Sequence, residues 1–445
     1  MHNKNGLRLS VDIGGTFTDT VLVDGRGQIL ATTKTPTTPD NPTLGALDGA
    51  KRVLAEAAVD WSQIDGFIHG TTLATNALIE RRGAVVVTVT TEGFRDILEI
   101  AYERRYSQYD INLVKPDLIV PRSRAFTIRG RIDARGRELE PLDEESLARL
   151  VEDLTASGAE AVAICLMHAY ANPAHELRLR DLLQARMPDL VISLSHEVSP
   201  EAREFERLST TIANAYIQPQ MASYLADFQG RFSDKGLTCP ILMMTAGGGM
   251  TTMETAARLP IRLVESGPAG GAILAARIAA ETGEREVLSF DMGGTTAKLC
   301  LIDHFRPQSA RKFEIARAAR FIKGSGMPVR IPVIEMIEIG AGGGSIAHVD
   351  RLGRLLVGPE SAGSEPGPAT FAKGGTEPTV TDADVMQGLI EPGRFAEGRL
   401  AIDMEAAQVA LEQGVGQALG LDAAQSAHGI SEIVDENMAS AGRMH

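Results

Sequence analysis

The sequence has few cysteines and no long apolar run, and both features narrow the class of protein. Only three of its 445 residues are cysteine, at the distant positions Cys165, Cys239 and Cys300. Without a C-x-x-C pair they predict buried thiols in a reducing compartment, not a zinc or redox centre. No run approaches the roughly 20 apolar residues that cross a bilayer, and no charged-then-apolar leader is visible. We therefore expect a cytoplasmic protein that does not insert into membranes.

The sequence also lacks the positive charge of a nucleic-acid-binding protein. Lysine and arginine total 44 against 58 aspartates and glutamates, which gives a formal net charge of -14. A nucleic-acid surface needs clustered lysine and arginine to displace counterions from phosphates. We expect no nucleic-acid partner.

Several common catalytic motifs are missing. The sequence contains no GxxxxGK[ST], no GxSxG and no HExxH, and its nine histidines are scattered. These absences exclude a P-loop NTPase, a serine-hydrolase elbow and a zincin protease.

Apolar runs and helical stretches alternate along the chain, a pattern typical of an α/β fold with mixed sheets. At 445 residues and 44% hydrophobic content, the chain is long enough for about two to three domains. The pattern predicts strands at residues 8–11, 20–23, 85–90, 161–167 and 287–290, with helices at residues 43–58 and on both sides of strand 161–167. Residues 340–375 are so rich in Gly, Pro and Ser that we expect a loop around a site.

The last residues, 426–445, place Ile430, Ile433, Val434 and Met438 on one helical face. No glycine or proline stop follows them. We therefore expect the chain to end inside a helix and more sequence to have followed.

An internal repeat is the strongest signal. Residues 10–24 read SVDIGGTFTDTVLVD, and residues 289–303 read SFDMGGTTAKLCLID, with seven of fifteen positions identical. Each copy predicts a hairpin: an apolar strand ending in aspartate, a Gly-Gly turn with hydroxyl groups, and a second apolar strand.

The hairpin tips predict a phosphate site. Glycine lets backbone N–H groups approach an oxyanion closely, and threonine hydroxyls add donors without charge. The aspartate before each turn is placed to hold Mg²⁺ or to orient a water. The residues predicted to bind phosphate are Gly14, Gly15, Thr16, Thr18, Gly293, Gly294, Thr295 and Thr296, and those predicted to hold the metal or the attacking group are Asp12 and Asp291. The alternative is that each copy is only a hairpin turn.

The two copies differ where Asp19 is replaced by Lys298. One hairpin therefore presents an extra carboxylate, and the other a cation, which we predict to be a catalytic contact to the terminal phosphate. The alternative for Lys298 is a solvated residue at a strand edge.

Three further candidate sites each have a structural alternative. Gly247 and Gly248 follow an apolar strand and precede a helix-like run, so they predict either a phosphate contact or close backbone packing. Asp382 opens a helix and is either a metal ligand or an N-cap. His69 precedes another helix and either belongs to an anion site or packs in a capping turn.

Seven motifs, in order along nearly the whole chain, resemble those of hydantoinase A/5-oxoprolinase proteins. They are DIGGTFTD at 12–19, HGTT at 69–72, ESGPAGG at 265–271, FDMGGT at 290–295, IGAGGGSI at 339–346, GPESAG at 358–363 and TVTD at 379–382. The resemblance implies an actin-like (ribonuclease H-like) duplicated ATPase fold with mixed β-sheets and an inserted α/β subdomain. It implies family segments at residues 1–198 and 199–445, the second incomplete at its end.

The same resemblance implies an activity. ATP and Mg²⁺ would phosphorylate the carbonyl oxygen of a cyclic amide such as a hydantoin or 5-oxoproline, and so activate it for hydrolysis. A hydantoinase B-type partner subunit or domain would complete the reaction, and we expect a homo-oligomer. The variants TTAK at 295–298 and EMIEIG at 335–340 resemble the ketone carboxylase branch, whose substrate would be a ketone. A non-catalytic nucleotide-binding module is the third alternative.

Overall fold

The structure is a computed structural model that describes residues 6–15, 17–38, 41–103, 105–113, 115, 117–317, 324–363, 365–395 and 401–443. The chain divides into two compact units, each assembled from separate stretches. Unit 1 contains residues 1–65, 267–308 and 334–445, and unit 2 contains residues 66–266 and 309–333. The expected family segments divide the sequence differently, because unit 2 continues without a break through residue 198. No helix of the described stretches is long and apolar enough to span a bilayer.

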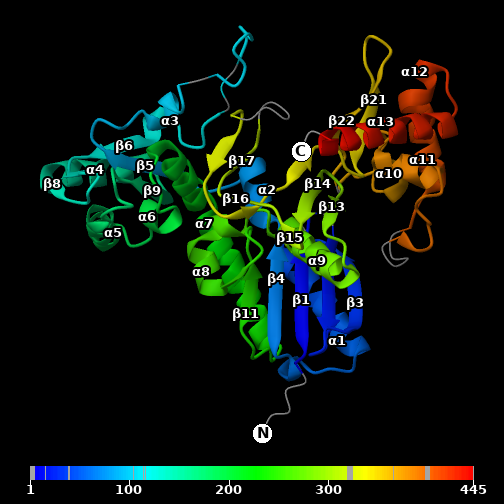
Figure 1. The fold of residues 1–445 in the computed structure, drawn as a ribbon, viewed down its shortest axis with the longest axis horizontal. Helices are drawn as coiled ribbons and strands as arrows, with labels where there is room; N and C mark the ends of the chain where they lie inside the picture. The colour runs from blue at the N-terminus through cyan, green and yellow to red at the C-terminus, as the bar shows by residue number, and fades with distance from the viewer. Residues whose placement is uncertain are drawn as a thin grey trace. The chain divides into compact units, whose positions relative to one another are not determined.

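Unit 1 begins with an antiparallel sheet in which β2 lies between β1 and β3 (Figure 1). The strands are β1 (Arg8–Ile13), β2 (Phe17–Val23) and β3 (Ile29–Pro36). Helix α1 (Pro42–Glu56) packs against β2 and β3. It starts where the Asn41 side chain accepts the Thr43 N–H, with proline at the first helical position. The predicted first hairpin and helix are confirmed.

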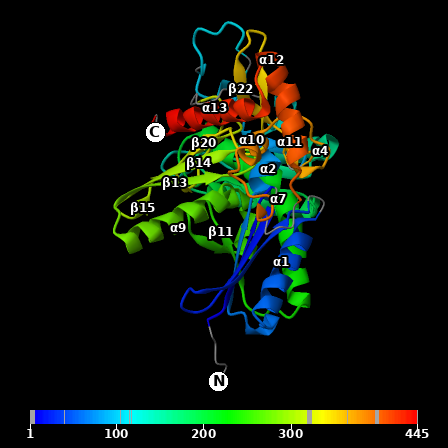
Figure 2. The ribbon, with the colours of Figure 1, turned by 90° about the vertical axis from the view of Figure 1, so that its right-hand side faces the viewer.

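The second hairpin of unit 1 is formed by β13 (Glu286–Met292) and β14 (Ala297–Asp303). Strands β15 (Arg306–Pro307) and β20 (Ile337–Ile339) also pair with β14. Helix α9 (Ser266–Thr282) packs Ala269 and Ala272 on Cys300 of β14. Leu299 instead joins a core with residues of α13 (Ala423–Arg443), which lies across these strands in Figure 2. Both faces of β14 are therefore covered.

In the remainder of unit 1, one prediction is wrong and another is confirmed. Residues 340–375 are not only loop, because β21 (Ser345–Val349) and β22 (Leu355–Ser361) form a hairpin within them. Ile430, Val434 and Met438 form the predicted buried face of α13, with Ile433 packed beside it. The described residues of unit 1 also include the helices α10 (Val380–Met386), α11 (Met404–Leu411) and α12 (Gln417–Leu419), a π-helical turn at Glu412–Gly416, and 3₁₀ turns at Trp61–Gln63 and Ala369–Phe371.

Unit 2 contains a parallel sheet in the order β10, β9, β5, β6. Its strands are β5 (Val86–Thr91), β6 (Ala125–Ile128), β9 (Ala161–Cys165) and β10 (Val191–Leu194). Helices α4 (Glu144–Ser157) and α5 (Ala174–Arg186) alternate with β9 and β10, as the sequence predicts. Every residue of β5 and β9 is buried, which is typical of a parallel sheet covered on both faces.

A second part of unit 2 is built around α7 (Glu204–Asp234), a helix of 31 residues. Strand β11 (Ile241–Met244) pairs with β4 (Gly66–Thr71) and with β12 (Met250–Thr252). The remaining elements of unit 2 are α2 (Leu73–Ile79), α3 (Ile97–Ile100), β7 (Arg131–Ile132), β8 (Glu138–Glu140), α6 (Ser195–Val198), α8 (Met253–Arg258), β16 (Ser309–Ala310), β17 (Phe313–Ile315) and β18 (Met327–Val329), with 3₁₀ turns at Arg122–Arg124 and Pro260–Leu263.

Candidate functional site

Both hairpins of unit 1 close with the same backbone hydrogen bond. In the first, Ile13 pairs with Thr18, and the Gly14 N–H donates to the Phe17 carbonyl at 2.9 Å. In the second, Met292 pairs with Ala297, and the Gly293 N–H donates to the Thr296 carbonyl, also at 2.9 Å. We call residues 14–17 the first tip and residues 293–296 the second tip. The repeat in the sequence is thus a repeat of hydrogen-bond register.

The second tip lies against a glycine loop, residues 340–345. The N–H groups of Gly343 and Gly344 donate to the carbonyls of Gly293 and Gly294 at 3.1 and 2.6 Å. A Cβ atom on Gly342 would lie only 2.6 Å from the Gly293 carbonyl oxygen and 2.8 Å from backbone carbons of the tip. The sequence predicted a loop around a site within residues 340–375. Glycine is required in this loop because its backbone lies so close to the backbone of the second tip.

The carboxylate of Asp12, beside the first tip, lies among other acidic groups. Burial by the surrounding protein, together with the charges of Asp19 and Asp291, raises the pKa of Asp12 to about 6, whereas Lys34 lowers it. Asp12 nevertheless keeps accessible surface, so solvent screening reduces the contribution of burial. The charge of Asp291, at the end of the equivalent strand of the second hairpin, thus acts on Asp12 within unit 1. The first turn of α9 also comes close, because a Cβ atom on Gly267 would lie 3.5 Å from Asp12 Oδ1.

The residue whose charge differs between the two copies is paired, in each copy, with an opposite charge on a third strand. Asp19 lies opposite Asp12 and is paired with Lys34 of β3 at 2.8 Å.

In the second copy, Lys298 lies opposite Asp291, and its Nζ is 3.9 Å from Glu338 of β20. Each copy therefore carries a cross-strand ion pair. In the first copy the hairpin strand carries the acid and the third strand the base, and in the second copy the two are reversed. The sequence repeat identified Asp19 and Lys298, but their partners lie outside it. Only 13% of the Lys298 side chain is exposed, and its contact to a phosphate stays a prediction.

Two residues predicted at the first tip have different outcomes. Thr16 lies outside the described residues. Thr18 has no exposed surface, and its hydroxyl lies 3.1 Å from the hydroxyl of Thr37. A buried hydroxyl does not reach a ligand in this arrangement, so the direct phosphate contact assigned to Thr18 is corrected to an internal contact. Of the other predicted tip residues, Gly15, Gly293, Gly294 and Thr295 are exposed, and Gly14 and Thr296 are partly exposed.

Gly247 and Gly248 belong to unit 2 and form a hairpin turn between β11 and β12. The Gly248 N–H donates to the Thr245 carbonyl at 2.9 Å. A Cβ atom on Gly247 would lie 3.4 Å from the Pro332 carbonyl oxygen. The expected strand-to-helix loop is therefore wrong, since another strand precedes α8, and the contacts favour the alternative of close backbone packing.

Asp382 has its carboxylate oxygens occupied by groups of the protein. Oδ1 accepts the Thr370 N–H at 2.8 Å, and Oδ2 accepts the N–H and hydroxyl of Thr379 at 2.9 and 2.7 Å and the Ala369 N–H at 3.3 Å. With Thr379 it forms a capping box at the start of α10. These contacts favour the N-cap alternative for Asp382 over the predicted metal ligand. Within the described stretches, no group of three or more His, Cys, Asp or Glu residues is arranged to hold a metal.

Asp384, two residues further along α10, gives a prediction about stability. Burial, with the charge of Asp435, raises the pKa of Asp384 to about 6. The folded state then binds the proton more tightly than the unfolded state, so this group costs stability as the pH rises from about 4 to about 6. At pH 7.5 we expect Asp384→Asn to recover about 1–2 kcal/mol after allowance for screening. The melting temperature should rise by about 2–6 °C.

Calorimetry at pH 7.5 and pH 4.5 tests this prediction. The gain should shrink at pH 4.5, where Asp384 of the parent protein is already protonated. Asp153→Asn, at an exposed position of α4, is the matched control and should change neither value. An equal gain at both pH values would contradict the assignment.

His69 of unit 2 is fully buried. Its Nε2 lies 2.6 Å from the Tyr224 hydroxyl, and its ring stacks on Phe228 with centroids 4.3 Å apart. These contacts favour the packed histidine of the two alternatives.

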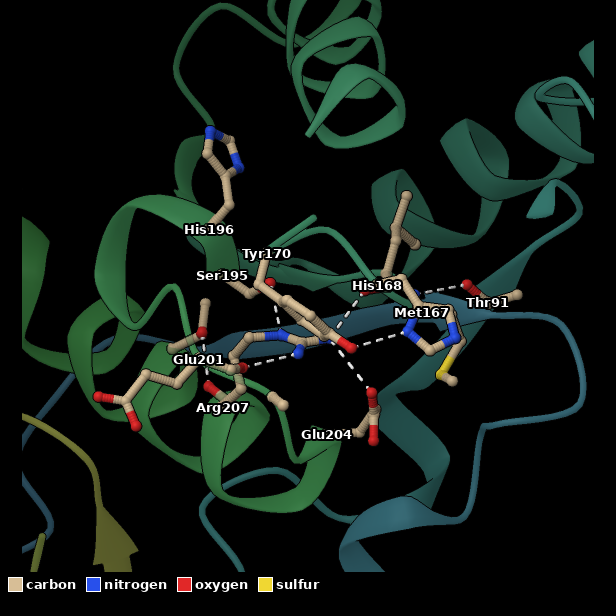
Figure 3. Close-up of polar contacts among 12 residues, drawn as sticks. Thr91, Met167, His168, Tyr170, Ser195, His196, Glu201, Glu204 and Arg207 are labelled. Atoms are coloured by element: carbon tan, nitrogen blue, oxygen red, sulfur yellow. Dashed lines mark hydrogen bonds and ion pairs between the residues drawn. The ribbon is translucent and has the colours of Figure 1, made fainter. Parts of the chain in front are cut away.

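A buried charged network in unit 2 was not predicted from the sequence. Arg207 of α7 has no exposed surface, and it donates to the Ser195 hydroxyl at 3.1 Å and to the Leu166 carbonyl at 2.9 Å. Figure 3 shows its guanidinium beside the ring of Tyr170, 5.2 Å from the centroid. The Ser195 hydroxyl donates in turn to buried Glu176 at 2.6 Å. Because these charges are hydrogen-bonded to other groups of the protein, we assign the network to the interior packing of unit 2.

Family models establish the relationship of the chain. The model for the hydantoinase/oxoprolinase N-terminal region matches residues 8–187, and the hydantoinase/oxoprolinase model matches residues 207–443. The chain belongs to the hydantoinase/oxoprolinase family. All seven motifs fall within the two matches, and the predicted resemblance is confirmed.

Relatives within the hydantoinase/oxoprolinase family include subunits of different enzymes. The chain is 34% identical to the caprolactamase subunit alpha of Pseudomonas jessenii, covering 98% of this chain and 62% of the relative. It is 35% identical to the acetophenone carboxylase gamma subunit of Aromatoleum aromaticum, covering 97% of this chain and 60% of the relative. The chain thus spans less than two thirds of the length of these relatives.

Solved structures of the family confirm the fold class. The nucleotide-free structure of acetone carboxylase, an enzyme of ATP-dependent acetone carboxylation, matches with a TM-score of 0.84 at 25% identity, covering 97% of this chain and 62% of that chain. The ATP-dependent caprolactamase of Pseudomonas jessenii matches with a TM-score of 0.78 at 33% identity, covering 98% and 63%. The mixed α/β architecture with an inserted α/β subdomain is shared with these enzymes.

Proposed function

We propose that this chain is the ATP-dependent activating part of an enzyme that opens a cyclic amide. The observation that carries the proposal is the pair of equivalent glycine tips in unit 1, each preceded by an aspartate, with Asp291 close enough to affect the pKa of Asp12. Backbone N–H groups at such tips suit the oxygens of a polyphosphate. The family relationship and the caprolactamase relative support a lactam or similar ring as substrate.

The residues present fit magnesium. Asp12, Asp19 and Asp291 gather negative charge around one place, and Lys34 offsets only part of it. Mg²⁺ takes one or two carboxylates and completes its shell with water and phosphate oxygens, so it does not require a cage of protein ligands. Asp12 and Asp291 are the residues that would hold it, and a divalent cation there would relieve the repulsion between them.

When bound, ATP supplies a phosphoryl group that converts the amide oxygen of the substrate into a better leaving group for hydrolysis. The task of this chain's residues is to hold the phosphate chain in line and to neutralise its charge. The N–H groups of the exposed residues Gly15, Gly294 and Thr295 would orient the phosphates, and Asp12 and Asp291 would hold the metal. A partner subunit or domain of the hydantoinase B type would then complete the hydrolysis, and we expect this chain to form a homo-oligomer.

A second candidate function is ATP-dependent carboxylation of a ketone. It is favoured by the acetophenone carboxylase relative and by Lys298, because the TTAK variant at residues 295–298 resembles the ketone carboxylase branch. Both candidates use the same phosphate site and differ in the acceptor of the phosphoryl group. Substrate-stimulated release of phosphate separates them: hydantoin, 5-oxoproline and caprolactam are compared with acetone and acetophenone in the presence of bicarbonate. Stimulation by a ketone and by no cyclic amide would replace the first candidate with the second.

Nucleotide binding gives a prediction that does not depend on the substrate. Mg·ATP at about 100 times its dissociation constant should stabilise the folded chain by about 2.7 kcal/mol. The corresponding rise in melting temperature is about 5–10 °C. Differential scanning fluorimetry measures it, with AMP and with ATP plus EDTA as controls that lack the terminal phosphates or the metal. A rise as large with AMP as with Mg·ATP would contradict recognition of the polyphosphate.

A further inference from the structure

The same carbonyl group is hydrogen-bonded at both tips, although the donors are unrelated. Gly14 and Gly293 occupy the same position of the repeat. The Gly14 carbonyl accepts the Thr37 hydroxyl at 2.9 Å, and the Gly293 carbonyl accepts the Gly343 N–H at 3.1 Å. Thr37 follows the end of β3, and Gly343 belongs to the glycine loop. Neither donor is part of the repeat.

These two hydrogen bonds determine where the next N–H points. In a trans peptide unit the C=O and the following N–H lie on opposite sides of the C–N bond. The N–H of Gly15 therefore points away from Thr37, and the N–H of Gly294 points away from the glycine loop. At the second tip the Gly294 carbonyl is also bound, by the Gly344 N–H at 2.6 Å, so the Thr295 N–H points outward as well. Adjacent N–H groups oriented in this way form an anion site.

The donor at the second tip is held firmly. The Gly343 carbonyl accepts both the N–H and the hydroxyl of Thr381, at 2.7 and 2.8 Å. A Cβ atom on Gly343 would lie 2.7 Å from that hydroxyl oxygen. Backbone groups thus hold the second tip from behind, and a change of side chain cannot release it without moving the loop.

The donor at the first tip is a single hydroxyl group, with Thr18 behind it. A threonine hydroxyl has one proton to donate. Because Thr37 donates its proton to the Gly14 carbonyl, the hydroxyl of Thr18, 3.1 Å away, is left as the donor to Thr37. The result is a relay from Thr18 to Thr37 to the Gly14 carbonyl, which gives the buried Thr18 hydroxyl a hydrogen-bond partner.

We propose that Thr37 is a positioning residue that aims the Gly15 N–H at the terminal phosphates of a nucleoside triphosphate. Thr18 acts behind it, and the glycine loop performs the same task at the second tip. This inference rests on the proposed phosphate site and adds the residues that orient it. Among the described residues, a side-chain hydroxyl holds the first tip, whereas backbone N–H groups hold the second.

Two substitutions of Thr37 test the proposal on the whole chain. Thr37→Val keeps the size and branching of the side chain and removes the donor, whereas Thr37→Ser keeps the hydroxyl. Isothermal titration calorimetry with Mg·ATP should give about a tenfold weaker dissociation constant for Thr37→Val, the size of effect expected when one phosphate contact is misaligned. Thr37→Ser should remain within about twofold of the parent protein. Thr32→Val, at an exposed position of β3, is the matched control and should bind normally.

The outcomes separate this inference from the proposed function. If the parent chain binds Mg·ATP and Thr37→Val binds it equally well, the role of Thr37 is refuted and the phosphate site stands. If the parent chain does not bind Mg·ATP, the proposed function itself fails. A general loss of stability in Thr37→Val that Thr37→Ser does not restore would show a purely structural role and would overturn the inference.

Discussion

Replacing Asp12 by asparagine is expected to abolish Mg²⁺-dependent ATP hydrolysis while making the nucleotide-free protein more resistant to heat. The carboxylate is held where burial and the charges of Asp19 and Asp291 disfavour its ionised form. Asparagine removes that repulsion, which after allowance for solvent screening should stabilise the protein by about 1 kcal/mol, or about 2–4 °C. It also removes the charge that would hold the metal, which should reduce turnover by about 10²–10³-fold.

Asp12→Asn is expected to raise the melting temperature and to lower the turnover of ATP. Replacing a residue that only stabilises the fold would lower both quantities, so the two kinds of role can be distinguished. Asp24, at the far end of the first hairpin, is the control. Its carboxylate accepts the N–H groups of Arg26 and Gln28 at 2.8 and 2.9 Å, which lower the pKa of Asp24. Asp24→Asn should therefore lower the melting temperature slightly and leave turnover unchanged. Wild-type ATPase activity in Asp12→Asn would contradict a role for this carboxylate in the reaction.

Adding one methyl group at Gly342 is expected to disrupt the second tip. The new Cβ would lie 2.6 Å from the Gly293 carbonyl oxygen and 2.8 Å from backbone carbons of Gly294 and Thr295. Backbone cannot yield as a flexible side chain can, so either the glycine loop or the tip must shift. We expect Gly342→Ala to cost about 3 kcal/mol, at the upper end of overpacking effects. Binding of Mg·ATP should be lost with the shape of the tip.

A second glycine of unit 1 serves as the matched control. Gly271 lies at an exposed position within α9, and a Cβ atom there meets nothing within 4 Å. Because alanine is the better helix former, Gly271→Ala should stabilise the protein by up to about 1 kcal/mol and leave nucleotide binding unchanged. Urea denaturation and calorimetric titration measure both quantities. Equal stability of Gly342→Ala and the parent protein would show that the loop does not restrain the tip.

The hairpins were predictable from the sequence because their signals are local. An apolar strand, an aspartate and a Gly-Gly turn recur in the same order, and identity between two copies separates them from an ordinary turn. The same local character explains the success with α1 and α13, where periodic apolar residues define a face. The tip residues Gly15, Gly294 and Thr295 were identified for this reason.

The contacts behind the tips were not predictable, because they join segments that are distant in the sequence. Thr37 has no motif around it, and only the folded sheet brings it to the Gly14 carbonyl. Thr18 looked like one more hydroxyl donor of the tip, yet the period of two along β2 turns it inward. The glycine content of residues 340–345 predicted a loop, but only the structure shows that this loop contacts the second tip.

Charge partners follow the same rule. The exchange of Asp19 for Lys298 was evident in the repeat, whereas Lys34 and Glu338 become relevant only through strand register. For Asp382 the residue was identified but its role was not. From the sequence alone, a carboxylate at the start of a helix is equally compatible with a metal ligand and with an N-cap. The N–H groups that occupy its oxygens come from residues 369–370 as well as from Thr379.

The most direct test of the account is a structure of the chain with Mg²⁺ and a non-hydrolysable ATP analogue. The account predicts that phosphate oxygens lie within about 3 Å of the N–H groups of Gly15 and Gly294, with the metal at Asp12 or Asp291. A triphosphate bound elsewhere on the chain, with both tips contacting only solvent, would contradict it.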